Sequence, residues 1–292
     1  MQIIDLSLLP PPSIVEELSF ETVLADMRAD LIERYPELEP TLQLESAVVV
    51  KLMEACAYRE VLVRARVNDA ARALLLARAE KADLDHLAAD FNLERKVLVP
   101  ASDGADAVLE GDAEFRARRQ LAPEGYAAAG PTDAYRFHAL SADASIKQVA
   151  AIKGDDNRVT VVLLSRDGNG AVDADVVAKV HEALSPLSVR PLTDALYTRS
   201  AEIIETSIAV RIEIGAGPDA AVIEAKAMAG LAEYASARHA IGTVLRIDGI
   251  IGAARKADPI ERVVVTAPNN DVDPGPFGAA YVTSITAEVV HV

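Results

Sequence analysis

Several residue types that would support particular functions are scarce or missing from this chain. It has no tryptophan and only 4% aromatic residues, so platforms for stacking bases or sugars are not expected. Cys56 is the single cysteine, which excludes an internal disulfide and is interpreted as a small buried hydrophobe between two alanines. Lysine and arginine total 29 against 45 acidic residues, and the resulting net charge of −16 argues against a nucleic-acid partner.

Long apolar runs are also missing. No stretch approaches the ~20 residues that span a bilayer, so membrane insertion is not expected. The N-terminus MQIIDLSLLPPPS lacks a basic region followed by an apolar run and a small-residue cleavage site. Synthesis and folding in a bacterial cytoplasm are therefore expected. At 292 residues and 51% apolar content, the chain can bury a substantial core divided among two or more compact units.

The first third of the chain predicts helices. Ser19 is placed to cap a helix whose apolar residues repeat on one face from Phe20 to Leu31. The stretch from Leu44 to Glu80 has neither Gly nor Pro and predicts one helix of roughly 36 residues, about 54 Å long. Its apolar residues, among them Val48, Leu52, Leu62 and Leu74, wrap most of the circumference. Such a helix must be covered along its length, and other chains are the expected cover.

The residue composition changes after Arg95. Residues 96–130 carry small and turn-forming residues around a short charged helix near Asp112 to Leu121, which indicates a junction segment. Helices and strands then alternate through residues 131–200, ending in a strand near Ala195 to Ser200, and again through residues 201–292. The predicted fold is a multidomain α+β protein, in which an N-terminal long-helix arm (1–95) precedes two small α/β domains.

A polar cluster lies in the stretch ADLDHLAADFNLER, residues 82–95. Asp83, Asp85 and His86 could bind a metal or move a proton, so one alternative function is a soluble metal-dependent hydrolase that imports a further ligand. A helix start explains the same residues, with Asp83 as the N-cap and Asp85 in the first turn. The helix start is preferred because no distant ligand is evident, and no catalytic, cofactor-binding or metal-binding residue is assigned.

The stretch RDGNGAVDAD, residues 166–175, invites comparison with a calcium loop. It fails that template because Val172 occupies the position that needs glycine, and Ala178 the position of the bidentate glutamate. A turn through Gly168 and Gly170, followed by Asp173 capping the next helix, accounts for the same residues.

A dense mixed-charge group marks the junction segment. It consists of Glu110, Asp112, Arg116, Arg118 and Arg119. Such a group can belong to a solvated helix, or it can form an ion-paired junction between domains or chains. The ion-paired junction is favoured because the group lies where the residue composition changes, after the N-terminal helical part.

Five blocks, in order along nearly the whole chain, resemble the baseplate J proteins of contractile-tailed phages, in the compact form shared with R-type bacteriocins. They are IIDLSLLPPPSIVEELSFE, DLDHLAADFNLER, EGDAEFRARRQLAPEGYAAAGPTDAYRFHALSAD, DGNGAVDADVV and VRPLTD. The third block is the most specific. One departure is that the family often places a glycine just before the Asp-Leu-Asp element, where this chain has Lys81 and Ala82.

The resemblance implies a structural role. It implies a subunit of the baseplate wedge, in which two copies join one copy of a different wedge protein, and six wedges close a ring around the hub. The N-terminal helices would share a bundle, with Val48, Leu52, Leu62 and Leu74 as contact residues, and later domains would pair between copies. The sheath-initiating wedge protein is a further candidate partner. The implied protein is not an enzyme, needs no cofactor, and rearranges when the sheath contracts.

Overall fold

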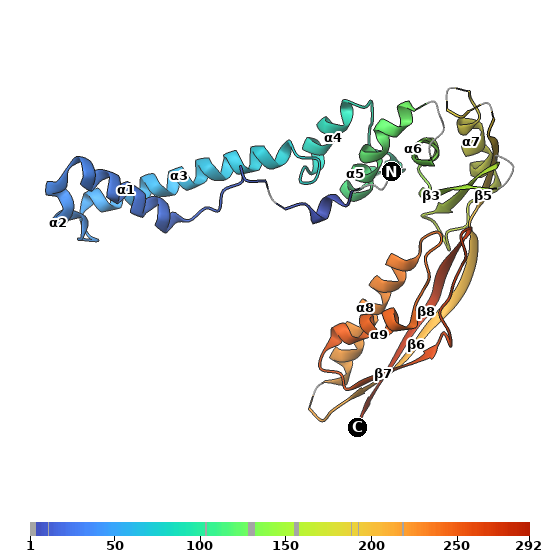
Figure 1. The fold of residues 1–292 in the computed structure, drawn as a ribbon. Coiled ribbons are helices and arrows are strands. Elements are labelled where there is room, and N and C mark those ends of the chain that lie inside the picture. Colours follow the sequence, from blue (N-terminus) through green and yellow to red (C-terminus); the bar gives the residue numbers. More distant parts are fainter. Residues whose placement is uncertain are drawn as a thin grey trace. The chain divides into compact units, whose positions relative to one another are not determined.

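The computed structural model describes residues 4–10, 12–102, 104–127, 132–154, 158–187, 189–191, 193–217 and 219–292. Two compact units make up the chain: unit 1 comprises Met1–Arg95 with Glu110–Gln120, and unit 2 comprises Lys96–Leu109 with Leu121–Val292. N-terminal helices followed by mixed helices and small sheets confirm the predicted α+β fold class (Figure 1). The expected boundary between residues 130 and 131 lies outside the described residues.

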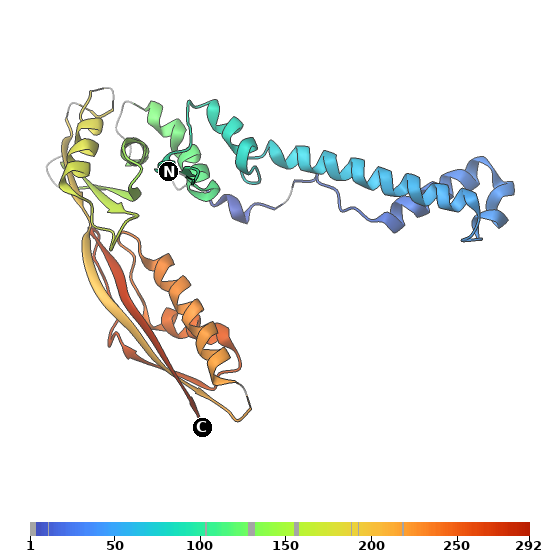
Figure 2. The same ribbon diagram turned by 180° about the vertical axis from the view of Figure 1, so that it is seen from behind.

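Unit 1 is helical. Its elements are η1 (Leu6–Leu8), α1 (Phe20–Arg34), η2 (Pro36–Leu38), α2 (Glu39–Leu42), α3 (Val48–Ala73), α4 (Lys81–Ala89) and most of α5 (Asp112–Leu121). Helix α1 lies beside the first part of α3 in both views (Figures 1 and 2). Buried Leu42, Val50 and Met53 form the core between them, with Leu24 and Met27 packed against it.

The start of α1 confirms the predicted cap. Ser19 has an extended backbone, and its hydroxyl oxygen accepts a hydrogen bond from the Thr22 amide at 3.2 Å. This bond satisfies one of the amides that an α-helix leaves without a partner at its N-terminus.

Helix α3 is shorter than the sequence predicted. It has 26 residues, or about 39 Å at 1.5 Å per residue, where roughly 36 residues were expected. At the N-terminal end, the extended backbone of Ala47 separates α3 from a turn. At the other end, Arg116 donates hydrogen bonds to the carbonyls of Leu76 and Ala79, at 2.8 and 2.6 Å. The residues after Ala73 favour a helix but adopt a turn, because Arg116, which is distant in sequence, binds their carbonyls.

The N-terminal segment runs along the second part of α3 within unit 1 (Figure 2). The Asn68 side chain, which is buried, accepts from the Glu16 amide at 3.0 Å and donates to the Glu16 carbonyl at 2.9 Å. Arg78 donates to the Leu9 carbonyl at 3.0 Å, and Gln120 to the Ile4 carbonyl at 2.9 Å. These side chains hold an extended segment that has no strand partner of its own in the described residues.

Helix α4 begins two residues before the predicted N-cap. Asp83 lies inside its first turn, so the prediction that Asp83 caps the helix is wrong. The Asp112 carboxylate instead accepts the Lys81 amide at 3.1 Å, so the capping oxygen comes from α5. Lys81 has φ of 50°, a left-handed conformation that glycine adopts without steric cost. This position, where the resemblance led us to expect glycine, thus has the conformation that favours glycine.

Unit 2 contains a short ribbon and then a three-stranded sheet. The ribbon pairs β1 (Val97–Val99) with β2 (Val108–Leu109), and η3 (Ala122–Tyr126) follows α5. The sheet has the order β3-β4-β5, formed by β3 (Ile146–Lys153), β4 (Arg158–Ser165) and β5 (Ala195–Ser200). β3 pairs antiparallel and β5 parallel with β4, whose residues from Thr160 to Ser165 are all buried. Helices α6 (Thr132–Ala142) and α7 (Ala174–Leu184) complete this core.

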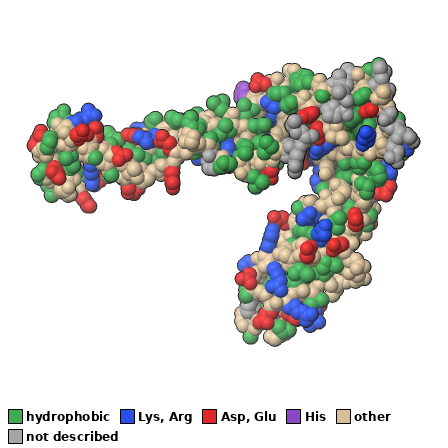
Figure 3. Space-filling view, viewed as in Figure 1, with side chains coloured by type: hydrophobic (Ala, Val, Ile, Leu, Met, Phe, Trp, Pro, Cys, Tyr) green, Lys and Arg blue, Asp and Glu red, His purple; other side chains and the backbone are tan. Residues whose placement is uncertain are grey.

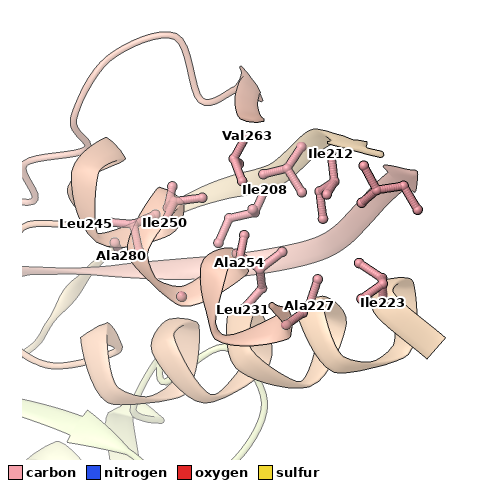
Figure 4. Packing of buried hydrophobic residues seen from close by; sticks show 14 residues of the cluster. Ile208, Ile212, Ile223, Ala227, Leu231, Leu245, Ile250, Ala254, Val263 and Ala280 are labelled. Atoms are coloured by element: carbon pink, nitrogen blue, oxygen red, sulfur yellow. The ribbon is translucent and has the colours of Figure 1, made fainter. Parts of the chain in front are cut away.

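A second sheet has the order β7-β6-β8. It is built from β6 (Glu202–Ile214), β7 (Arg262–Ala267) and β8 (Gly278–His291), with α8 (Ala220–Arg238), α9 (Ile247–Ala254) and η4 (Arg255–Ala257). Figure 4 shows Ile208 and Ile212 of β6 facing Ala227 and Leu231 of α8, with Ile250 of α9 beside them. β8 pairs parallel with β6 and lies at the edge of the sheet.

The two sheets of unit 2 share a small core. Val162 and Leu164 of β4 are buried together with Ala201 and Ala279, and Phe277 packs against them. The Gln148 side chain accepts a hydrogen bond from the Ile241 amide at 2.8 Å. Within the residues that the structure describes, no helix is long and apolar enough to cross a membrane.

Candidate assembly surface

Helix α3 has two different faces. Its buried residues are Val50, Met53, Ala57 and Asn68. At about 100° per residue, these fall within roughly a sixth of the circumference. This inner face packs on α1 at one end and binds the N-terminal segment at the other.

The opposite side of α3 is exposed and largely apolar. We call it the outer face, and it consists of Val48, Leu52, Cys56, Arg59, Val63, Arg66 and Val67. These side chains fall within about 100° of the circumference, centred away from the inner face. Figure 3 shows hydrophobic side chains along the part of the surface that α3 occupies. Valine and leucine at this exposure, repeated along one helix, are typical of a surface that another protein covers.

The four predicted contact residues are all exposed. The exposed fractions are 85% for Val48, 63% for Leu52, 46% for Leu62 and 75% for Leu74. Val48 and Leu52 belong to the outer face, and Leu62 lies at its margin. Leu74 follows the last residue of α3 and is not part of the helix.

Cys56 was expected to be buried, and this prediction is wrong. Its side chain is exposed, because it lies on the outer face, which none of the described residues of unit 1 covers. The prediction relied on the alanines that flank Cys56, but neighbours in sequence do not show which side of a helix the rest of the chain covers.

The junction charges lie around α5. The guanidinium of Arg118 donates two hydrogen bonds to the Glu110 carboxylate, at 3.1 and 2.6 Å, and both side chains are at least 94% buried. Arg118 also donates to the Glu94 carbonyl and lies 5.2 Å from the centre of the Phe115 ring. The pair with Glu110 holds the Arg118 guanidinium in place, and the bond to the Glu94 carbonyl fixes α5 to the segment that follows α4.

Arg95 forms two further ion pairs, with Asp85 of α4 and with Asp112 at the start of α5. Arg95 lies 2.7 Å from Asp112 and 2.5 Å from Asp85, and it donates to the Glu110 carbonyl at 2.8 Å. Burial raises the pKa of Asp112, but hydrogen bonds from the Lys81 amide and Arg95 outweigh it, so the pKa is lowered. Asp112 therefore stays ionised and can cap α4 at neutral pH.

Arg116 and Arg119 both bind backbone carbonyls. Arg116 bonds to the carbonyls after α3, and Arg119 donates to the Leu87 carbonyl at 2.9 Å. The Arg119 guanidinium also lies 3.6 Å from the centre of the Phe91 ring. All of these contacts lie within unit 1. The sequence marked the group, including Arg118, as a junction but did not identify Arg95, which pairs with Asp112.

The candidate catalytic cluster does not form a metal site in the described residues. No group of three or more His, Cys, Asp or Glu side chains there could hold a metal ion. Asp83, Asp85 and His86 are exposed on α4, and Asp85 forms an ion pair with Arg95. The hydrolase alternative thus has no geometric support in this part of the chain.

The rejected calcium loop forms a turn. Gly168 and Gly170 both have positive φ, at 59° and 96°, and the Ser165 amide donates to the Gly170 carbonyl at 2.8 Å. Asp173 occupies the N-cap position of α7, although its side chain makes no capping hydrogen bond.

Comparison with known proteins identifies the family. Residues 45–102 match the model of the baseplate J-like N-terminal domain, and residues 127–200 match that of the baseplate J-like central domain. Baseplate protein J of Escherichia phage P2 is 40% identical over 281 residues, which cover 93% of each chain. This chain belongs to the baseplate J family. It is a structural protein of a phage-type tail baseplate, and the first matched region contains the whole of α3.

Proposed function

We propose that this chain is a subunit of the baseplate wedge. Two copies join one copy of a different wedge protein through their N-terminal helices, and six wedges close a ring around the hub. The subunit has no enzymatic activity, and its packing changes when the sheath contracts. The sheath-initiating wedge protein is a candidate neighbour. The observation that carries this proposal is the exposed apolar outer face of α3, in a chain 40% identical to a phage baseplate protein over 93% of its length.

The outer face supports a helical bundle because its exposed apolar side chains follow one another along the helix, and each would gain free energy from burial. Val48, Leu52, Val63 and Val67 are each more than half exposed. Burying a side chain of this size fully contributes about 1.5–3 kcal/mol. Covering the face with helices from other chains would remove most of that apolar area from water.

Charge substitution on the outer face tests the bundle. Leu52→Glu and Val63→Glu should leave the chain folded, because both side chains face solvent, but should prevent recovery of the complex with the wedge partner. Val222→Glu is the matched control, since Val222 is 48% exposed on α8 of unit 2. Native mass spectrometry of co-expressed proteins would measure the complex. Complexes of wild-type yield from both outer-face variants would contradict the proposed bundle.

Ring closure is proposed to use unit 2, through the edge strand β8. The Val292 amide donates to the Ile214 carbonyl of β6, so alternate amides at Ala287 and Val289 point away from β6. Unpaired strand edges of this kind accept strands from other chains. Ala287→Pro should allow the wedge complex but prevent rings, whereas Ala287→Val, which keeps the amide, should allow both. Closed rings from Ala287→Pro would refute this role of β8.

A further inference from the structure

Two cations on the outer face of α3 have no partner in the described residues. The other cations of α3 form ion pairs within or near the helix: Lys51 with Glu54, Arg64 with Glu60 and Glu16, and Arg72 with Asp69. Arg59 and Arg66 form none, and both side chains are exposed. Both have apolar neighbours on the outer face: Arg59 lies between Leu52 and Val63, and Arg66 follows Val63. In a chain with a net charge of −16, two free arginines in an apolar stripe indicate that the covering surface is acidic.

Helix α1 carries a complementary stripe. Its side away from α3 exposes Thr22, Asp26, Ala29 and Glu33, at successive spacings of four, three and four residues. Asp26 and Glu33 have no ion pair in the described residues, whereas the neighbouring Asp30 is paired with Arg34 at 3.0 Å. Ala29 lies between the two acids, and a small residue there allows another helix to approach closely.

The two stripes match in spacing. Arg59 and Arg66 are seven residues apart, and so are Asp26 and Glu33, which corresponds to about 10.5 Å along each helix. One register of two helices can therefore form both ion pairs at once. The stripes cannot meet within one chain, because α1 and α3 already face each other through Met27, Met53 and their neighbours.

We propose that the outer face of α3 in one copy packs against the exposed face of α1 in a second copy, with Asp26 and Glu33 opposite Arg59 and Arg66. This inference rests on the proposed function and names the occupant of its helical surface. The contact is reciprocal, since α1 of the first copy then meets α3 of the second, as a two-fold interface requires. Four helices would form the bundle, with Leu52 and Val63 packed against Ala29 and its neighbours.

Charge reversal tests the pairing in the full-length chain. One variant carries Arg59→Glu and Arg66→Glu, and the other carries Asp26→Arg and Glu33→Arg. Each variant alone opposes like charges at both contacts, so its self-association should weaken by at least about ten-fold. Mixing the two variants restores opposite charges at both contacts, and association should return to within about three-fold of wild type. Analytical ultracentrifugation would measure both, with circular dichroism confirming that each variant is folded.

The matched control carries Arg34→Glu and Arg72→Glu. It changes the net charge by as much as the first variant, but both arginines pair only within their own helices. Its association should equal that of wild type. A mixture of the two reversed variants that fails to associate, or a single variant that associates as wild type does, would overturn the proposal. Loss of binding only to the different wedge protein, without rescue on mixing, would assign the face to that protein. That outcome would also overturn the α1–α3 pairing while leaving the proposed function standing.

Discussion

The buried pair of Arg118 and Glu110 should contribute more to the stability of unit 1 than any exposed ion pair. Replacing Arg118 with Met keeps much of the side-chain volume but removes both hydrogen bonds to Glu110 and the one to the Glu94 carbonyl. A carboxylate that is 4% exposed then loses its bidentate partner. Removing one partner of a buried pair typically costs about 3–5 kcal/mol. For a unit of this size, such a loss should lower the midpoint of thermal unfolding by more than about 10 °C.

Urea unfolding followed by helical circular dichroism would measure the loss at low protein concentration. Arg72→Met is the matched control, because the pair of Arg72 and Asp69 is half exposed and should contribute less than about 1 kcal/mol. The double variant Arg118→Met with Glu110→Leu should recover much of the stability, since no charge is then left buried. If Arg118→Met were no less stable than Arg72→Met, the claim that the buried contacts of Arg118 fix α5 would be refuted.

Three further predictions follow from single contacts. Arg116→Ala leaves two carbonyls unpaired and should cost about 1–3 kcal/mol in urea unfolding while reducing the yield of complete baseplates, so unchanged values would contradict its bridging role. Lys81→Gly relieves a left-handed φ and should stabilise by up to about 1 kcal/mol, whereas Glu80→Gly, at an extended position, should destabilise; equal effects would refute the strain. Burial lowers the pKa of His138, although a hydrogen bond to the Gly125 backbone opposes this shift. The folded state therefore binds a proton at His138 less readily than the unfolded state does. Stability should therefore fall as the pH drops below about 6.5, and a variant with His138→Gln should show a smaller fall; an identical pH profile would refute this.

Local signals in the sequence predicted most elements. The helix from Asp112 to Leu121 and the strand from Ala195 to Ser200 have the predicted bounds, and Ser19 caps α1 as expected. In each case the residues that decide the structure are neighbours in sequence.

The errors have one physical cause, which is that distant residues decided the outcome. Helix α3 ends early because Arg116 binds the carbonyls beyond it, and α4 starts early because Asp112 supplies its cap. Cys56 is exposed because the packing of α3 is one-sided. Propensity and periodicity describe a segment and its preferred faces, but they do not show which face the rest of the chain will cover.

The thiol of Cys56 gives the most direct measurement of the central claim, that the outer face of α3 is buried on assembly. Cys56 is the only cysteine in the chain and lies one turn from Leu52 and from Arg59 on that face. At concentrations low enough to keep it monomeric, the free chain should react fully and rapidly with a maleimide, as should the denatured protein used to count total thiol. In the assembled wedge or particle, labelling should be slowed at least about ten-fold. Equal labelling rates in the free chain and in the assembled particle would show that the outer face stays exposed and would contradict the account.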